Sequence, residues 1–500
     1  MPQIKLSPQL EKVLILLLLL LVSVGLIWQV ISLSHFVPLH DWDEAIYAQV
    51  AKEWLKSPSL TLHYNGVVWF EKPPVPFVLM GGLMALFGTS ILPLRILSAV
   101  LGILTLVSVY SIAKRITKQS MVGLVAATVL LSSNFFLDRS SLINVDMYLT
   151  LSWLLYVVSE KLGLRLLAIV LGVGSKSLLG FIPLLVDLCY ELFSRTLTLR
   201  KIRDYSIQMV VGSIWYVVMF AKFGSVFVQS HFLDHMISRI TRPIELHFGD
   251  RFFYIIQIGN DLGVWSVIAL IGGILLAVYV FRSFLQHKEG QNASMRKLVS
   301  LTIALPLVYL ALLTVGKSKL TWYTIPVIPF LAIWASLTIH KIQKLHKYLV
   351  FLPILIVAIN LSVFGIRTIS EDFQKYQVPD KTNLALCINT IEKGGGEPLV
   401  YLVSSQERTD AQVIEAAKLQ IGSSFIYGSA PAFVYYVNQP VSFYYSSDKM
   451  KTDALAQKVL VVHEADLADP QILRIARTWN TNSVAPVCVS GPWQAFARDY

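Results

Sequence analysis

The sequence is poor in charged residues and in cysteine for a chain of 500 residues. Aspartate, glutamate, lysine and arginine make up 15% of it, whereas a typical soluble domain carries about 25%. Three cysteines are too few for a disulfide framework or a cysteine-rich metal cluster, although Cys387 and Cys488 leave a single pairing open. These scarcities argue against a soluble enzyme and a secreted disulfide scaffold.

Apolar residues, by contrast, are abundant and account for 55% of the chain. The segment from Val13 to Ser34 carries no charge and, as a helix, is long enough to cross the roughly 30 Å of hydrocarbon in a bilayer. It also exceeds the usual core of a signal peptide, and no small-x-small cleavage site follows it, so we expect a membrane anchor. Because comparable runs recur along the chain, the sequence predicts a polytopic α-helical membrane protein.

Eleven apolar segments have a length and composition that suit transmembrane helices. They are residues 13–34, 91–113, 121–137, 144–160, 162–174, 177–193, 205–222, 253–281, 298–315, 320–339 and 348–367. We therefore expect a transmembrane domain over residues 1–368, with a first extracytoplasmic loop over residues 35–90.

The distribution of basic residues predicts the orientation of this domain. With a cytoplasmic N-terminus, every inner loop contains a lysine or arginine cluster, such as Lys114 with Arg115 or Arg200 with Lys201. Cytoplasmic loops of membrane proteins are enriched in these residues. Because basic residues are expected in these loops, the net charge of +11 does not require a nucleic-acid partner. We expect a multi-pass protein of the plasma (inner) membrane.

From about Ser370 the apolar runs shorten to the length of strands. Runs at 399–403, 424–427, 441–445 and 459–462 alternate in part with helical patterns at 411–419 and 471–479. The sequence therefore predicts a small α/β extracytoplasmic domain over residues 369–500. This tail has no Walker loop or Rossmann fingerprint, so it gives no sign of nucleotide chemistry.

Ionisable residues gather on the predicted outer side, where they are costly near the bilayer and typical of a functional site. The first outer segment has three carboxylates in four positions, Asp41, Asp43 and Glu44. As a helix it is amphipathic and suits the membrane surface. Three carboxylates are more than a helix N-terminus needs, which favours a functional role over simple capping.

Four further polar clusters fall on the same side. They are Glu71-Lys72 before two prolines, Asp138-Arg139 with Asp146, Lys176 in a glycine-rich turn, and Lys317-Ser318-Lys319. Carboxylates of this kind can act as general bases, and the nearby cations can bind an anionic group.

Two of these motifs carry a resemblance to a known family. Asp43-Glu44-x-x-Tyr47 and Glu71-Lys72-Pro73-Pro74 resemble the first-loop signature of the GT-C superfamily of polyprenyl-phosphate-sugar glycosyltransferases, which includes aminoarabinose transferases and protein O-mannosyltransferases. The segments at 145–150, 175–176 and 319–329 are similar to later motifs of this family. Ile46 replaces an arginine of the aminoarabinose transferases, which leaves the donor sugar open.

The resemblance implies a GT-C fold and an inverting transfer of sugar, without an enzyme nucleophile, from a polyprenyl phosphate donor to an extracytoplasmic acceptor. The acceptor stays open among a glycolipid, a cell-envelope polysaccharide and a protein. It implies catalytic roles for Asp43 as the base, with Glu44 and Glu71 beside it. The expected phosphate ligands are Lys72, Arg139, Lys176, Lys317 and Lys319, and the expected substrate contacts are Tyr47, Asp146 and Tyr323.

The sequence makes no cofactor certain, and a divalent metal ion is left open. Glu71 has the chemistry to hold a metal or substrate, and His231 and His235 have the i, i+4 spacing of a metal-binding pair but lack a clear third ligand. The main alternative function is a transporter or flippase of lipid-linked sugars. A transporter would be expected to have internal repeats and charges in mid-span, and the sequence shows neither.

Overall fold

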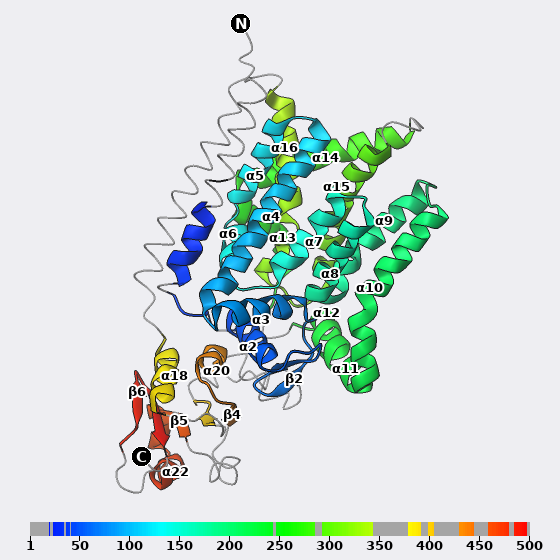
Figure 1. The fold of residues 1–500 in the computed structure, drawn as a ribbon. Coiled ribbons are helices and arrows are strands. Elements are labelled where there is room, and N and C mark those ends of the chain that lie inside the picture. The colour runs from blue at the N-terminus through cyan, green and yellow to red at the C-terminus, as the bar shows by residue number, and fades with distance from the viewer. Residues whose placement is uncertain are drawn as a thin grey trace.

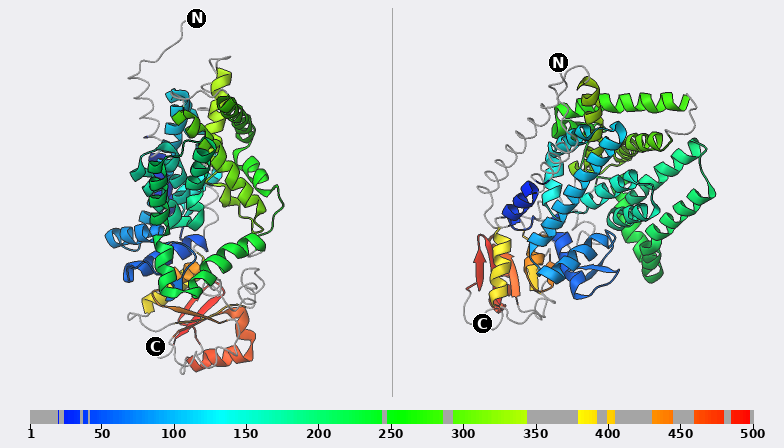
Figure 2. Two further views of the ribbon diagram at one scale, coloured as in Figure 1. Left: turned by 90° about the vertical axis from the view of Figure 1, so that its right-hand side faces the viewer. Right: turned by 45° about the horizontal axis from the view of Figure 1, so that its top comes forward.

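The computed structural model describes residues 20, 24–34, 37–40, 42–243, 247–285, 293–343, 379–391, 399–404, 430–444, 459–479 and 485–497. Most of them form a helical bundle, and the C-terminal residues form a mixed sheet at one end of it (Figure 1). Figure 2 shows the same arrangement from two further directions. The predicted combination of a helical membrane protein and a small C-terminal α/β region is confirmed.

The bundle is built from helices of unequal length. The long ones are α4 (Ile91–Thr117), α10 (Leu199–Phe223), α14 (Val264–Leu285) and α15 (Ala293–Val315). The shorter ones are α3 (Val75–Phe87), α5 (Ser120–Leu131), α6 (Asn134–Ser141), α7 (Asp146–Val158), α8 (Leu162–Lys176), α9 (Ile182–Phe193), α13 (Phe253–Leu262) and α16 (Ile328–Gln343).

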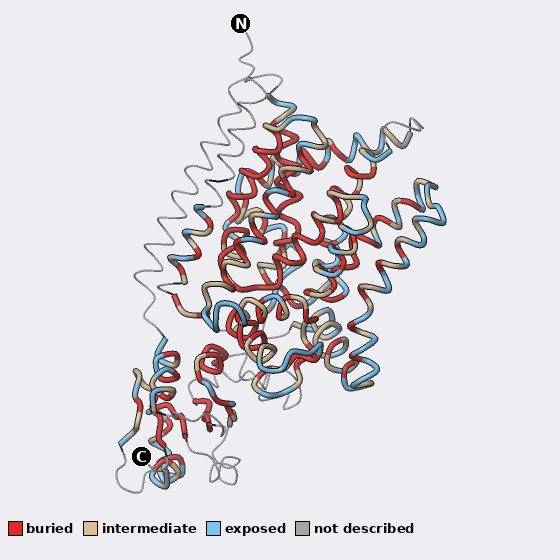
Figure 3. Tube along the Cα trace, viewed as in Figure 1, coloured by how far each residue is buried: buried red, intermediate tan, exposed pale blue. Residues whose placement is uncertain are grey.

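Five helices of the described part are long and apolar enough to cross a membrane, or six if the bent pair α5 and α6 counts as one span. The predicted span 348–367 and much of 13–34 lie outside the described residues. The total of eleven spans therefore stays a prediction. Outward faces of α10 and α14 are exposed yet apolar, with side chains such as Val210 and Leu270 more than half exposed (Figure 3). Such faces suit contact with lipid.

Three predicted spans have breaks that apolar length alone did not indicate. The segment 121–137 bends by 78° between α5 and α6, where the Ser133 hydroxyl accepts a hydrogen bond from the amide of Phe136 and begins a new helix. The segment 253–281 divides at Gly263, whose φ of +52° favours glycine. The segment 320–339 begins with a 3₁₀ turn over Thr321–Thr324 before α16.

The apolar pair at 162–193 reverses direction, as its glycines indicate. Ser177 has a φ of +56° and starts the short 3₁₀ segment η1 (Ser177–Phe181). A Cβ on Gly180 would lie 2.0 Å from the backbone nitrogen of Val173, so only glycine allows this close return of the chain. Lys176, the last residue of α8, is therefore held at the tip of a helical hairpin.

Two basic residues near the predicted inner side, Arg165 and Lys297, are buried in ion pairs. Arg165 lies 2.8 Å from Asp187, while Lys297 lies 2.7 Å from Asp187 and 2.6 Å from Glu191. These pairs join α8, α9 and α15. Buried charges require such partners because an isolated charge in an apolar interior is very costly.

The C-terminal sheet has the strand order β4-β3-β5-β7-β6. Its strands are β3 (Leu399–Leu402), β4 (Val441–Tyr444), β5 (Val459–His463), β6 (Cys488–Ser490) and β7 (Trp493–Ala497). β3, β4 and β5 are parallel, β7 runs antiparallel to β5, and β6 runs antiparallel to β7. Helices α18 (Asp380–Ile391), α20 (Pro431–Tyr436) and α22 (Pro470–Trp479) accompany the sheet. The predictions for 399–403, 441–445, 459–462 and 471–479 are confirmed, while 411–419 and 424–427 lie outside the described residues.

A disulfide between Cys387 and Cys488 ties α18 to β6, which answers the pairing that the sequence left open. The sheet region also docks on the first loop of the bundle. Asn65 donates to the carbonyl of Val441 at 2.7 Å and accepts from its amide at 2.9 Å. The ammonium of Lys52 donates to the carbonyl of Tyr435 at 2.6 Å.

Candidate active site

The first element of the site is α2 (Asp43–Lys56), which carries the predicted carboxylates at its N-terminus. It packs between α3 and α20, and every residue from Glu44 to Ala51 is buried. The prediction of a helix lying on the membrane surface is therefore wrong. The first half of the helix is enclosed by other parts of the protein, and of its first two carboxylates Glu44 is buried while Asp43 stays partly exposed.

The Glu44 carboxylate is buried, and both of its oxygens accept hydrogen bonds within the protein. Its two oxygens accept hydrogen bonds from Nε and Nη2 of Arg95, both at 2.8 Å, and from the amides of His40 and Ile143 at 2.9 and 3.0 Å. Burial alone raises the pKa of Glu44, but the charge and hydrogen bonds of Arg95 outweigh it and hold the pKa below its usual range. The carboxylate joins α2 to α4 and to the segment before α7.

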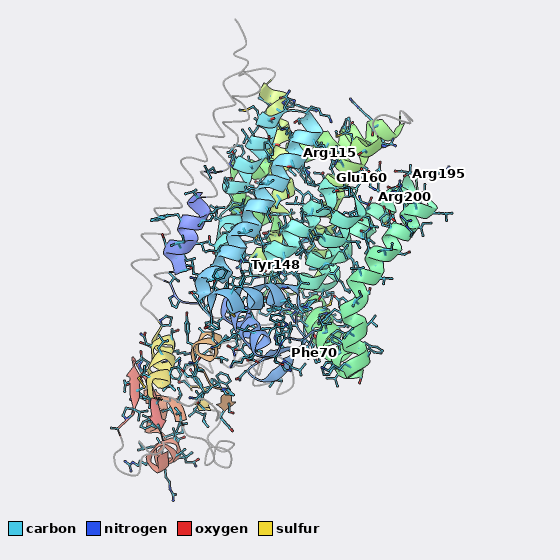
Figure 4. The ribbon with its side chains drawn as sticks, in the orientation of Figure 1. Phe70, Arg115, Tyr148, Glu160, Arg195 and Arg200 are labelled. Carbon is cyan, nitrogen blue, oxygen red and sulfur yellow. A yellow bond between two sulfur atoms is a disulfide. The ribbon has the colours of Figure 1, made fainter. Side chains whose placement is uncertain are left out.

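Glu71 and Lys72 lie in the turn between β2 (Val67–Trp69) and α3, at the end of the bundle where Phe70 is labelled in Figure 4. Pro73 and Pro74 end the turn and begin α3. Phe70 packs edge-on against Phe223 and Phe227, and its carbonyl lies 2.6 Å from Nδ1 of His231. These contacts fix the backbone directly before Glu71.

A π-helical segment, η2 (Val228–Ile237), brings His235 to this turn. Nε2 of His235 lies 2.7 Å from the Lys72 ammonium, and its Nδ1 lies 3.7 Å from Glu71. Burial and the neighbouring charges of Lys72 and Arg239 lower the pKa of His235 well below its usual value, so the ring is neutral at pH 7. In the neutral ring, Nε2 of His235 accepts a hydrogen bond from the Lys72 ammonium, and its Nδ1–H group faces the Glu71 carboxylate.

Three cations converge beside this turn: Lys72, Lys176 and Arg239. Burial, together with the charges of Arg239 and Lys176, lowers the pKa of Lys72 to about 8, although the charges of Glu71 and Asp43 oppose this shift. Lys176 lies 4.8 Å above the ring of Tyr323, and Arg239 donates to the Tyr323 hydroxyl at 3.3 Å. Tyr323 thus bridges two of the cations.

Three carboxylates, Asp43, Glu71 and Asp146, lie beside these cations. Lys176 forms an ion pair with Asp146, the first residue of α7. Burial raises the pKa of Tyr47 well above its usual value, and the charges of Asp43, Asp146 and Glu71 raise it further, so this buried phenol sits among all three. The structure therefore brings together the predicted Asp43, Tyr47, Glu71, Lys72, Asp146, Lys176 and Tyr323.

Other predicted site residues lie outside this cluster. The Lys319 ammonium is buried and donates to the carbonyls of Leu313 and Thr314 at 2.8 and 2.9 Å, so it caps the C-terminus of α15. Lys317 is exposed. The expected role of both lysines as phosphate ligands stays a prediction. Arg139 stacks on the ring of Trp322 at 4.8 Å, next in sequence to Tyr323, and so borders the cluster.

The two histidines do not act as a pair toward one ligand. His231 uses Nδ1 on the Phe70 carbonyl and Nε2 on the Ser177 hydroxyl at 3.0 Å, whereas His235 faces Glu71 and Lys72. Within the described ranges no group of three or more histidine, cysteine, aspartate or glutamate side chains has an arrangement that would hold a metal ion.

Arg239 is the cation of the cluster that the sequence did not assign as a phosphate ligand. It follows His235 by four residues, as His235 follows His231, so the same helical spacing that singled out the histidines also contained it. That spacing placed the three residues near one another, but it did not show that they face Lys72.

The helical bundle has a GT-C fold, as the resemblance of the first loop predicted. Residues 71–222 match the family described as dolichyl-phosphate-mannose-protein mannosyltransferase. The crystal structure of ArnT from Cupriavidus metallidurans bound to undecaprenyl phosphate superposes with a TM-score of 0.61 at 15% identity, over 96% of this chain and 97% of that one. At this identity the likeness shows the fold alone.

More particularly, the chain is similar to aminoarabinose transferases. It is 26% identical over 349 residues to undecaprenyl phosphate-alpha-4-amino-4-deoxy-L-arabinose arabinosyl transferase 2 of Pseudomonas fluorescens, which covers 66% of this chain and 57% of the relative. An Archaeoglobus fulgidus oligosaccharyltransferase superposes with a TM-score of 0.51 at 11% identity, over 92% of this chain and 71% of that one. These findings confirm the resemblance to the GT-C polyprenyl-phosphate-sugar transferases.

Proposed function

We propose that this chain is an integral membrane glycosyltransferase that moves a sugar from a polyprenyl phosphate to an acceptor hydroxyl on the extracytoplasmic side. The observation that carries the proposal is the meeting of three cations and three carboxylates at one end of a membrane bundle. The relative in Pseudomonas fluorescens is named for a transfer from undecaprenyl phosphate, which supports the same class of donor.

The cations provide the half of the site that binds phosphate. A polyprenyl phosphate carries more negative charge after the sugar leaves than before, so cations beside it stabilise the departing group in the transition state. Arg239 offers a planar fork to two phosphate oxygens, whereas Lys72 and Lys176 act as point charges. Burial and, to a smaller extent, repulsion by Arg239 and Lys176 lower the pKa of Lys72, and an arriving phosphate relieves the repulsion.

Asp43 serves as the general base. It stands at the partly exposed start of α2, close enough to Lys72 and Tyr47 to shift the pKa of each. Its carboxylate takes the proton of the acceptor hydroxyl while that oxygen attacks the anomeric carbon of the sugar. The bond from that carbon to the phosphate oxygen breaks in the same step, and polyprenyl phosphate leaves. One displacement of this kind inverts the anomeric carbon.

Glu44 holds this base in place rather than taking part in the proton transfer. All four of its hydrogen bonds go to groups of the protein, and Arg95 keeps it ionised. Glu71 and His235 orient Lys72 from the opposite side. Asp146 orients Lys176, and Tyr47 and Tyr323 line the space where the sugar would lie.

The donor and acceptor reach this end of the bundle from the extracytoplasmic side of the plasma membrane. Arg115, Arg195 and Arg200 lie at the opposite end from Phe70 (Figure 4), and a basic end of a membrane protein is usually cytoplasmic. The disulfide in the sheet region supports the same orientation, because disulfides persist in oxidising compartments.

An in vitro transfer assay tests the proposal against the alternative of a lipid-linked-sugar transporter. Purified protein is mixed with a membrane lipid extract and a panel of radiolabelled undecaprenyl-phosphate sugars. A glycosyltransferase moves label from the donor to a new product and releases undecaprenyl phosphate. Movement of intact donor across a vesicle bilayer, with no new product for any sugar, would instead establish a flippase. The same panel identifies the sugar.

A further inference from the structure

A polar cavity lies at the end of the bundle opposite the candidate active site. It is lined by residues of three elements: Arg115 at the end of α4, residues 158–162 between α7 and α8, and Arg200, Arg203 and Asp204 at the start of α10. Its volume is about 550 Å³. That is within the range of roughly 300–1,000 Å³ of small-molecule sites. Figure 4 shows Arg115, Glu160 and Arg200 at this end.

Two arginines, the half-buried Arg115 and the buried Arg165, hold the wall of the cavity in shape. Arg115 donates to the carbonyl of Val158 at 2.9 Å, and Arg165 donates to the carbonyl of Ser159 at 2.9 Å. Arg165 is itself fixed by its ion pair with Asp187. The segment between α7 and α8 is therefore anchored on both sides, so the cavity does not depend on a flexible loop.

Two of the four cations on the cavity wall, Lys161 and Arg200, have no side-chain partner among the described residues. Asp204 pairs with Arg203 at 2.8 Å, and Glu160 accepts a hydrogen bond from Ser294 at 2.8 Å. The side-chain cations of Lys161 and Arg200 form neither an ion pair nor a hydrogen bond with any residue that the structure describes. The four cations and two carboxylates of the wall leave a net charge of +2, which suits an anion.

Apolar side chains beside these cations indicate which anion. Leu199 is 86% exposed and Ile202 is 45% exposed, and they flank Arg200 and Arg203 on α10. A soluble phosphate gains nothing from such neighbours. An anionic phospholipid places its phosphate near cations and its acyl chains near apolar side chains, and basic pockets between transmembrane helices on the cytoplasmic side bind lipid headgroups in this way.

We propose that the cavity formed by Arg115, Lys161, Arg200 and Arg203 binds the phosphate of an anionic phospholipid headgroup. This site is separate from the donor and acceptor, because it lies at the other end of the bundle. Lys161 and Arg200 attract the phosphate, and Arg115 keeps the wall of the cavity in place. A lipid bound there contacts α4, α8 and α10 together.

Native mass spectrometry of the full-length protein in neutral detergent tests this site. Phosphatidylglycerol should bind it saturably and more tightly than phosphatidylcholine. A cation that contacts the bound headgroup contributes about a factor of five in lipid affinity, so Lys161→Gln and Arg200→Gln should each weaken binding roughly fivefold and the double variant roughly 25-fold. Both side chains are exposed, so neither change should disturb folding.

Two control variants distinguish binding in this cavity from attraction of the lipid elsewhere on the protein. Lys114→Gln removes an exposed cation next to Arg115 in sequence that does not line the cavity, and it should bind phosphatidylglycerol like the wild type. Lys72→Ala, in the candidate active site, should do the same. Equal weakening by Lys114→Gln and the double variant would show diffuse surface attraction and overturn the proposal. Loss of binding in Lys72→Ala would place the lipid at the other end and overturn it too.

Inorganic phosphate and glycerol 3-phosphate distinguish a lipid from a soluble ligand. If either competes with phosphatidylglycerol at a similar concentration, the cavity is a site for a soluble phosphate and the lipid proposal is wrong. Equal binding of phosphatidylcholine would likewise contradict it, since the cations would then confer no selectivity.

Discussion

Glu44 and Arg95 form a buried ion pair with two hydrogen bonds of 2.8 Å, and through it the start of α2 is fixed to α4. Arg95 also donates to the carbonyls of Val37 and Pro38, each at 2.9 Å, so one guanidinium holds both the helix and the segment that leads into it. Asp43 is the residue next to Glu44. Its position at the cluster therefore depends on an arginine that itself contacts no substrate group.

This arrangement predicts that the ion pair matters for folding. Arg95→Met leaves the Glu44 carboxylate buried without its cation, and breaking a buried pair in this way costs about 3–5 kcal/mol. The variant should unfold at a markedly lower denaturant concentration or temperature than the wild type. The double variant Glu44→Gln with Arg95→Met should recover much of that loss, because no uncompensated charge remains. A wild-type stability for Arg95→Met would contradict this account.

The lowered pKa of Lys72 predicts a pH dependence of lipid phosphate binding. Its pKa of about 8 means that the ammonium is mainly charged at pH 7 and loses its proton as the pH rises through 8. The affinity for undecaprenyl phosphate should therefore fall between pH 7 and pH 10. Lys72→Arg stays charged over this range, so its affinity should fall much less, and Lys72→Ala should bind weakly throughout.

Binding of labelled undecaprenyl phosphate in nanodiscs measures these profiles. Lys56→Gln, which removes an exposed cation at the far end of α2, is the matched control and should keep the wild-type profile. A wild-type affinity for Lys72→Ala, or the same fall with pH for Lys72→Arg as for the wild type, would remove Lys72 from the phosphate site.

Lys319 and Lys317 should behave differently from the cations of the cluster. Lys319→Met removes two charged hydrogen bonds from the end of α15, which should lower stability by about 1.5–3 kcal/mol while the affinity for undecaprenyl phosphate stays unchanged. Lys317→Gln should change neither quantity, since the side chain is exposed. Thermal unfolding and the same binding assay test both variants. Weaker binding at unchanged stability for either would restore it as a phosphate ligand.

The orientation of the bundle predicts a pattern of labelling by an impermeant thiol reagent. In a Cys189→Ser background, a cysteine at the exposed Ser57 should react in intact cells, because this position lies near the active-site end. A cysteine at the exposed Lys114, at the basic end, should react only after permeabilisation. Reaction at position 114 but not at position 57 in intact cells would reverse the orientation.

The sequence predicted the parts of the site that local pattern determines. The carboxylates of Asp43 and Glu44 open a helix, Glu71 and Lys72 precede a proline turn, and Lys176 lies where glycines reverse the chain. Each of these features depends on residues close in sequence. The resemblance to the GT-C family could then assign a chemistry to them.

The sequence could not predict which partner each charge would find in the folded protein. Glu44 pairs with an arginine 51 residues away, and Lys319 contacts carbonyls of α15. The spacing of residues gives no information on such tertiary contacts. For the same reason the sequence did not show that Glu44 is buried against Arg95, nor that Arg239 lies beside Lys72.

The central claim is that Asp43 takes the proton of the acceptor during sugar transfer, and Asp43→Asn tests it most directly. The amide keeps the shape of the side chain but cannot accept that proton, and a general base typically contributes about 10²–10⁴-fold in rate.

The matched control is Asp234→Asn, which changes a carboxylate on η2 that is hydrogen-bonded to Gln229 and should keep near wild-type activity. The measurement is the rate of undecaprenyl phosphate release from the labelled donor that the assay identifies, at matched protein abundance. The account predicts a loss of at least 10²-fold for Asp43→Asn with unchanged affinity for undecaprenyl phosphate. A rate within a few-fold of the wild type, with Glu71→Gln inactive, would show that the base is Glu71 instead.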